Sequence, residues 1–239
     1  MWMAGLVLAV ILLRAVRVWF SIPLYRRFWL REARRPAPQN AISLVVLGDS
    51  VAQGIGATEI RFSYVGRLMR AITELTGRPA QIINLSVSGA RMQDVLEHQL
   101  PELARLRLRP DIILLEAGAN DTAAYRLPRF SQTVRVLLDG LPPHTIVATV
   151  PPFGGRRNRA ARRLNKIIIR EVAAHGMSLA PVHEQLLKNS GIRNTSGDFF
   201  HPGNRGHGIW FEAFWQVIKP RLQADAAARP SATIKGQKP

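Results

Sequence analysis

The sequence predicts an α/β protein, a three-layer α/β/α sandwich around a parallel five-stranded sheet. Short apolar segments alternate along the chain with amphipathic helical patterns, which is the order of elements that builds a parallel sheet. The apolar segments are continuous, as expected of strands that are covered on both faces. The 239 residues, 47% of them hydrophobic, suffice for one domain with a well-filled core.

Residues 1–35 form a hydrophobic and basic segment that we expect to attach the protein to a membrane. Trp2–Leu13 is uncharged and almost wholly apolar, whereas arginines are frequent from Arg14 onward. This run falls short of the roughly 20 residues that cross a bilayer, although Trp2–Leu24 would cross it if Arg14 and Arg17 reached the headgroups. Two alternatives are open: a helix lying in the membrane interface, and a terminal helix packed on the domain.

The distribution of charge favours the cytoplasmic side for the domain if this segment spans. Basic residues follow the apolar run, which is typical of an N-terminus outside and a domain inside. A cleaved signal peptide is not expected, because no basic residues precede the apolar run and no small-residue cleavage site follows it.

The folded domain is predicted over residues 42–223. A proline-containing polar linker, 36–41, precedes it, and a small polar tail, 224–239, is expected to be disordered. The predicted strands are Ile42–Leu47, Ile82–Val87, Asp111–Ala117, Thr145–Val150 and Met177–Ala180. The predicted helices run approximately over Arg61–Thr76, Met92–Leu106, Phe130–Leu138, Asn158–Ala174 and Gly206–Leu222.

The net charge of +17 arises from 33 basic residues against 16 acidic ones. This balance favours an anionic partner such as a membrane surface or a charged substrate. No nucleic-acid motif accompanies the charge, so nucleic-acid binding is not predicted. The absence of cysteine excludes disulfides, thiolate metal sites and a cysteine nucleophile. Neither a metal-site spacing nor a phosphate-binding loop occurs, so no metal and no cofactor are expected.

Five arginines follow the fourth predicted strand and open a helix. Cations at a helix N-terminus oppose the helix dipole at a cost of about 0.3–1 kcal/mol each, which suggests another role for them. We consider contact with lipid phosphates or with an anionic substrate, and a solvated basic face is the alternative. The five are Arg156, Arg157, Arg159, Arg162 and Arg163.

Ser50 is the candidate nucleophile. It lies in Gly48-Asp49-Ser50, directly after the first predicted strand, with Gly54 four residues further on. The turn after a parallel strand lies at the carboxyl edge of the sheet, where open α/β sheets bind their ligands. Asp49 is expected to accept hydrogen bonds from the amides of this turn.

The other groups that serine hydrolysis requires occur in loops expected at the same edge. Asp198 and His201 are three residues apart before the last helix, so the carboxylate can orient the ring and leave its other nitrogen for Ser50. Gly89 can approach a reacting carbonyl with its backbone N–H, and Asn120 can offer its side-chain amide. With the N–H of Ser50, these make three donors for an oxyanion.

These blocks together resemble the SGNH (GDSL-type) hydrolase family over about Ile42–Leu222. The resemblance rests on Gly48-Asp49-Ser50-x-x-x-Gly54, the glycine block at Gly89, Gly118-x-Asn120-Asp121 and Asp198-x-x-His201-Pro202. It implies a flavodoxin-like hydrolase that acts on esters without a cofactor. In that family pattern Ser50 is the nucleophile, His201 the general base, Asp198 its orienting partner, and Gly89 and Asn120 the oxyanion donors beside Ser50.

The predicted function is therefore a membrane-associated serine esterase or lipase-like hydrolase. Deacetylation of a carbohydrate by the same triad is the nearer alternative. An inactive, membrane-tethered binding domain is the alternative of another class. Glu116, an acidic residue within an otherwise apolar predicted strand, is expected to pair with a nearby arginine.

Overall fold

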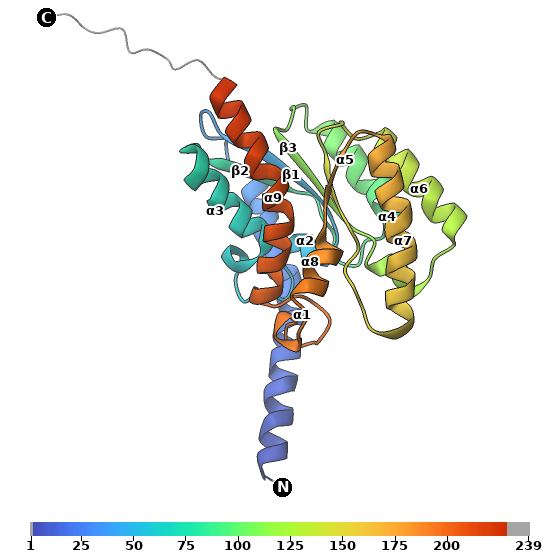
Figure 1. Ribbon diagram of the computed structural model, residues 1–239. Helices are drawn as coiled ribbons and strands as arrows, with labels where there is room; N and C mark the ends of the chain where they lie inside the picture. The colour runs from blue at the N-terminus through green and yellow to red at the C-terminus, as the bar shows by residue number, and fades with distance from the viewer. Residues whose placement is uncertain (1, 229–239) are drawn as a thin grey trace, which may run out of the picture.

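Five parallel strands form the central sheet of the computed structural model, which describes residues 2–228 (Figure 1). The strand order β2-β1-β3-β4-β5 puts β1 and β3 in the interior of the sheet. This confirms the predicted fold class, including the short last strand, β5. The strands are β1 (Ile42–Gly48), β2 (Ala80–Asn84), β3 (Ile112–Glu116), β4 (Ile146–Ala148) and β5 (Ser178–Ala180).

The two faces of the sheet carry separate hydrophobic cores. Alternate residues of a strand point to opposite faces, so Leu44 and Val46 enter one core whereas Val45 and Leu47 enter the other. All four side chains are fully buried, which explains the continuous apolar run of β1. The first core is covered by α3 (Tyr64–Thr76), α8 (Val182–Lys188) and α9 (Asn204–Ala228). The second is covered by α4 (Met92–Asp94), the π-helical turn Val95–Gln99, α5 (Leu100–Arg105), α6 (Leu127–Asp139) and α7 (Gly155–Ala174).

Helix α1 (Trp2–Ala33) is longer than the domain side that it contacts, and its N-terminal turns project beyond the domain (Figure 1). Its C-terminal half packs on the first core, where Trp29 is 2% exposed and donates its indole N–H to the carbonyl of Gln53. Tyr25 likewise donates its hydroxyl to the carbonyl of Ala57. Among the described residues, no helix combines the length and the apolar character that crossing a bilayer requires.

The C-terminal end of the fold differs from the sequence-based expectation. Helix α9 continues to Ala228, so residues 224–228 are helical, although they were assigned to the tail. Residues 229–239 lie outside the described part of the chain. Short helical turns complete the fold: α2 (Ser50–Gln53), Ile60–Phe62, Asn120–Ala123 and Ile192–Asn194.

Candidate active site

The carboxyl ends of the strands meet a cavity of about 330 Å³ at one edge of the sheet. Ser50 begins α2 directly after β1, and Asn120 begins the short turn after β3. His201 reaches the cavity from the loop before α9. Ser50, Asn120 and His201 all line this cavity, together with apolar side chains that include Leu186 and Trp210.

Ser50, His201 and Asp198 form a continuous chain of contacts. The Oγ of Ser50 lies 3.0 Å from Nε2 of His201, and Nδ1 of His201 lies 2.5 Å from Oδ2 of Asp198. Ser50 is buried, and His201 is partly buried at the cavity wall. The geometry therefore gives a hydroxyl whose proton a ring nitrogen can accept, with a carboxylate behind the ring.

The carboxylate of Asp198 is held ionised by its neighbours. Its Oδ1 accepts hydrogen bonds from the Ser196 hydroxyl and from the backbone N–H groups of Phe200 and His201. Burial alone would raise the pKa of Asp198, but the hydrogen bonds from His201, Ser196 and Phe200 outweigh it and hold the pKa well below its usual range. A permanently charged Asp198 can stabilise a protonated His201.

Close packing around Gly48 fixes the start of the nucleophile turn. A Cβ at Gly48 would lie 2.1 Å from the carbonyl oxygen of Glu116, so this position requires glycine. The buried side chain of Gln99 accepts from the N–H of Gly48 and donates to its carbonyl, both at 2.8 Å. Asp49 accepts from the N–H of Val51, as expected of a residue that caps the turn.

Asn120 and Gly89 are placed differently from each other. The amide nitrogen of Asn120 donates to the carbonyl of Ala90 at 3.0 Å and to Oδ2 of Asp49 at 3.2 Å. Gly89 adopts a φ of +85° in an exposed turn, and it is not among the residues that line the cavity. The Asn120–Ala90 bond nevertheless ties this turn to the cavity wall.

Two polar side chains that the motifs do not include brace this region. Gln53 donates to the carbonyl of Ser86 and accepts from the hydroxyl of Ser88, so it joins α2 to the turn before Gly89. Asn84 donates to the carbonyl of Ala52 and accepts from the N–H of Ser86. The sequence shows a glutamine three residues after the serine, inside the Gly48–Gly54 block. Its burial and its partners, Ser86 and Ser88, could only be found in three dimensions.

The expectation of an arginine partner for Glu116 is wrong. Its carboxyl is buried beside the carboxyl of Asp49. Burial, followed by the charge of the neighbouring carboxyl, raises the pKa of Glu116 well above its usual value. Burial raises the pKa of Asp49 to about 6.

His207 is also buried behind the site, and burial lowers its pKa to about 3, so it is neutral there.

Arg157 is the member of the Arg156–Arg163 cluster that contacts the wall of the Ser50 cavity. Its guanidinium lies 4.5 Å from the ring centre of Phe153 and 5.1 Å from that of Phe200, and it donates to the carbonyl of Ala119 and the hydroxyl of Thr122. Phe200 in turn packs edge-on against the ring of His201. Arg157 therefore holds the cavity wall together, and this explains a cation at the start of α7.

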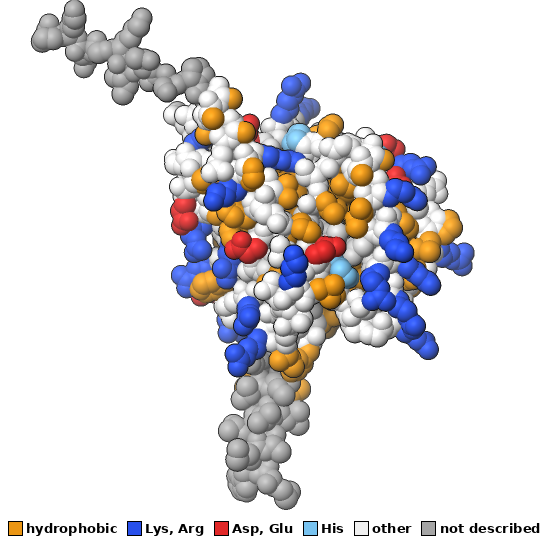
Figure 2. All heavy atoms as spheres, in the orientation of Figure 1, with side chains coloured by type: hydrophobic (Ala, Val, Ile, Leu, Met, Phe, Trp, Pro, Cys, Tyr) orange, Lys and Arg blue, Asp and Glu red, His pale blue; other side chains and the backbone are white. Residues whose placement is uncertain are grey.

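The remaining arginines of the cluster are exposed along α7. Figure 2 shows basic side chains gathered on this side of the molecule. They are Arg156, Arg159, Arg162 and Arg163. Over the described residues, no group of three or more histidine, aspartate or glutamate side chains has an arrangement that could hold a metal ion.

The sequence matches the model of the GDSL-like lipase/acylhydrolase family over residues 46–209. The chain belongs to this family. The match spans the nucleophile turn, β3 and the loop that carries His201, which confirms the resemblance to SGNH hydrolases seen in the motifs. The protein is accordingly a carboxylic ester hydrolase of the GDSL-like family.

Solved structures share the fold of this GDSL-like hydrolase. TesA matches with a TM-score of 0.64 and 20% identity over 74% of this chain and 98% of its own. A variant of Axe2, an acetyl xylan esterase from Geobacillus stearothermophilus, matches with a TM-score of 0.61 and 18% identity over 74% and 94%. A lipase/acylhydrolase from Enterococcus faecalis matches with a TM-score of 0.61 and 18% identity over 75% of this chain and 96% of its own. A comparison with curated proteins returns no significant match.

Proposed function

We propose that the protein cleaves carboxylic esters through Ser50, His201 and Asp198 by way of an acyl-enzyme. The observation that carries this proposal is the chain of contacts of 3.0 Å and 2.5 Å that joins the three side chains. Ser50 and His201 are 151 positions apart in the sequence. A merely structural serine has no need of a partly buried histidine–carboxylate pair in line with its hydroxyl, so the contacts also disfavour an inactive binding domain.

In the proposed reaction Ser50 Oγ attacks the ester carbonyl while its proton passes to Nε2 of His201. Asp198 holds the proton on Nδ1 of the same ring, which leaves Nε2 free as a base, and stabilises the imidazolium that forms. Collapse of the tetrahedral intermediate expels the alcohol, which takes the proton from His201. Water then attacks the acyl-enzyme with His201 as base, and the carboxylic acid leaves.

Three donors are proposed for the oxyanion: the backbone N–H groups of Ser50 and Gly89, and the side-chain amide of Asn120. Both amide hydrogens of Asn120 have partners in the structure, and the bond to Asp49 is the longer of the two. The substrate oxygen would therefore share the hydrogen that points to Asp49. One such donor typically contributes about 10²–10³ in rate.

The cavity lining favours a small apolar acyl group. Leu186, Trp210, Pro151 and Phe153 line the space beside Ser50 and can bury an apolar acyl group. Deacetylation of a carbohydrate is the second candidate, favoured by the shared fold with Axe2, which is described as an acetyl xylan esterase. The triad would be the same for both reactions.

A panel of p-nitrophenyl esters from acetyl to palmitoyl, together with acetylated xylan, tests this proposal. We expect hydrolysis by the wild type and none by Ser50→Ala. A fluorophosphonate probe should label the wild type and leave the variant unlabelled. Intact folded protein that neither hydrolyses any ester nor takes the label would overturn the proposal. The ratio of short-chain to carbohydrate turnover decides between the two substrates.

We also propose that α1 attaches the protein to an anionic membrane surface. Since no described helix meets the requirements for a span, the interfacial arrangement is the one we favour. Support comes from exposed apolar side chains on α1, interspersed with Arg17, Arg26 and Arg27. These exposed side chains are Leu12, Leu13, Val16, Trp19, Phe20 and Leu24.

Vesicle flotation tests the attachment. The protein should float with vesicles that contain anionic phospholipid and less well with neutral ones, and added salt should weaken the binding. Binding to neither kind of vesicle at low salt would contradict the attachment without affecting the proposed ester hydrolysis.

A further inference from the structure

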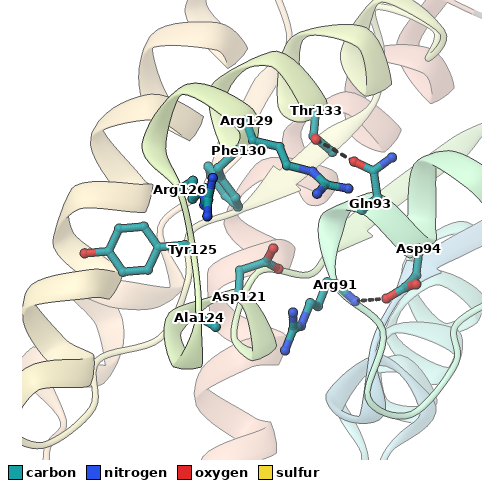
Figure 3. A pocket seen from close by; sticks show the side chains of 10 residues that line it. All are labelled: Arg91, Gln93, Asp94, Asp121, Ala124, Tyr125, Arg126, Arg129, Phe130 and Thr133. Carbon is teal, nitrogen blue, oxygen red and sulfur yellow. Dashed lines mark hydrogen bonds between the residues drawn. The ribbon is translucent and has the colours of Figure 1, made fainter.

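A second cavity, of about 520 Å³, is separate from the Ser50 cavity, and Asp121, which follows Asn120, is among the residues that line it (Figure 3). It opens between the turn that follows Gly89 and the first turn of α6. Arg91, Arg126 and Arg129 line it, and we call these three residues the arginine basin. They come from two separate elements, because Arg91 precedes α4 whereas Arg126 and Arg129 open α6.

The walls of the arginine basin are the two segments that carry the proposed oxyanion donors. Arg91 follows Gly89 by two residues, and Asp121 directly follows Asn120. Asn120 and the carbonyl of Ala90 are hydrogen-bonded across the two segments. Met92 donates its N–H to Oδ2 of Asp121 at 3.1 Å in the same way. The basin and the Ser50 cavity share no lining residue, so a substrate that places a group in the basin must extend past these two segments.

The guanidinium groups of the basin have no carboxylate within 4.0 Å anywhere in residues 2–228. Two acidic side chains do line the cavity, but both have other partners. Asp94 accepts from the backbone N–H of Arg91, and Asp121 is buried with its Oδ2 bound to Met92. Figure 3 shows Arg91 beside Asp121 and Arg129 extending toward Gln93.

Three guanidinium groups face two acidic side chains around this hollow, so the basin keeps a net positive charge that an anion can balance. Guanidinium groups are also the donors whose planar geometry matches phosphate and carboxylate oxygens best. We propose that the arginine basin binds an anionic group, phosphate or carboxylate, carried by the ester that Ser50 cleaves. This proposal rests on the proposed function and names the class of its substrates: esters whose acyl or alcohol part carries a negatively charged group.

Paired substrates test the basin. Mono-p-nitrophenyl glutarate carries a carboxylate on the acyl side, and its methyl ester is the neutral counterpart. In the second pair, 4-acetoxybenzoate carries the carboxylate on the alcohol side, and its methyl ester is neutral. We expect the wild type to favour the charged member of at least one pair by tenfold or more in kcat/KM. That preference should fall by roughly tenfold or more in Arg126→Gln/Arg129→Gln, since a hydrogen bond to a charged group contributes at least this much.

Arg109→Gln is the matched control, because Arg109 is exposed just before β3 at the amino edge of the sheet. It should leave both activity and charge preference unchanged. A wild-type preference that is absent, or that persists in the double variant, overturns the proposal.

Binding of inorganic phosphate, measured by calorimetry at constant ionic strength, separates the basin from the hydrolysis itself. The dissociation constant should rise about tenfold or more in Arg126→Gln/Arg129→Gln and stay constant in Arg109→Gln. Arginine-dependent phosphate binding without any ester hydrolysis would overturn the proposed function and retain an anion site. Hydrolysis with phosphate binding that is absent, or equal in all three proteins, would overturn the anion site alone.

Discussion

Glu116 and Asp49 lie carboxyl against carboxyl beneath the nucleophile turn, with exposures of 2% and 1%. The strand register brings them together: Gly48 on β1 pairs with Glu116 on β3, and Asp49 follows with its N–H bonded to the carbonyl of Glu116. Two buried carboxyls in contact cannot both ionise without a large cost, so the pair retains a proton at neutral pH. Glu116 holds that proton, because its pKa is raised further above its usual value than the pKa of Asp49. Asp49 also accepts from the Asn120 amide at 3.2 Å, which orients that amide.

This pair predicts a loss of stability as pH rises. A carboxyl whose pKa is about 6 in the native state, against 3.8 ordinarily, binds its proton more tightly when folded. The free energy of unfolding therefore falls between about pH 4 and pH 6, by an amount on the order of 2–3 kcal/mol for Asp49. Glu116, whose pKa is also raised, adds its own loss of stability with rising pH, so Glu116→Gln should make the total decline smaller. Urea unfolding at several pH values measures it, and an unchanged pH dependence in the variant would contradict the pairing.

Asp198 predicts the opposite pH dependence. Because its native pKa is lowered, its contribution to stability is complete above about pH 4 and is lost as the pH falls further. Asp198→Asn should remove part of that acid-induced loss. It should also lower kcat by about 10³–10⁴, because the ring of His201 is then free to take the wrong tautomer. Asp225→Asn, an exposed change on α9, is the control, and equal activity losses in the two variants would contradict the assigned role.

The proposed oxyanion donors predict a loss in kcat with little change in KM. Asn120→Ala should lower kcat by about 10²–10³, because its amide acts on charge that develops in the transition state. An increase in KM alone would contradict this role for Asn120.

Gly89 and Gly77 allow a matched comparison of glycine replacements. Both have positive φ, +85° and +65°, and a Cβ at either would meet nothing within 4 Å. Each change to alanine should cost a similar 1–2 kcal/mol or so in stability. Only Gly89→Ala should also reduce kcat, since Gly77 ends α3 away from the site. Equal activities with equal stability losses would remove Gly89 from the oxyanion donors.

Two tryptophans of α1 predict distinct outcomes. Trp29→Ala should lower the free energy of unfolding by about 3–5 kcal/mol, because the side chain is buried in the core and bonded to Gln53. Trp19, which is 71% exposed on the same helix, should change stability by less than about 0.5 kcal/mol when replaced by alanine. Trp19→Ala should instead weaken vesicle binding. For the same reason, deleting residues 1–35 should destabilise the domain rather than release it intact.

Arg157 predicts an effect on the cavity wall that Arg159 does not share. Arg157→Gln removes contacts with Phe153 and Phe200, worth about 1 kcal/mol each. We expect KM for p-nitrophenyl esters to rise several-fold and the chain-length preference to broaden, with kcat less affected. Arg159→Gln, an exposed neighbour on α7, should leave both unchanged. Equal behaviour of the two variants would show that Arg157 is only one more surface charge.

The sequence by itself determined the layered α/β fold and the identity of the candidate residues. Continuous apolar strands that alternate with helical patterns are local signals, and they predicted the sheet down to the short strand β5. The nucleophile turn and the Asp198-x-x-His201 block are also local, so Ser50, Asp198 and His201 were named without three-dimensional information. Helix ends were shifted by a few residues, as in α9, because the last turns of a helix carry little pattern of their own.

Only the tertiary structure decided which side chains meet across the chain. The β1–β3 register, which no local pattern encodes, put Glu116 against Asp49 instead of an arginine. Trp29 lies within the expected membrane segment, residues 1–35, but it packs in the first core of the domain. Burying its indole there removes apolar surface from water, which stabilises the fold. The arginine basin likewise exists because two turns converge at one edge of the sheet. Long-range contacts follow from how whole layers pack, and that information is spread over the entire chain.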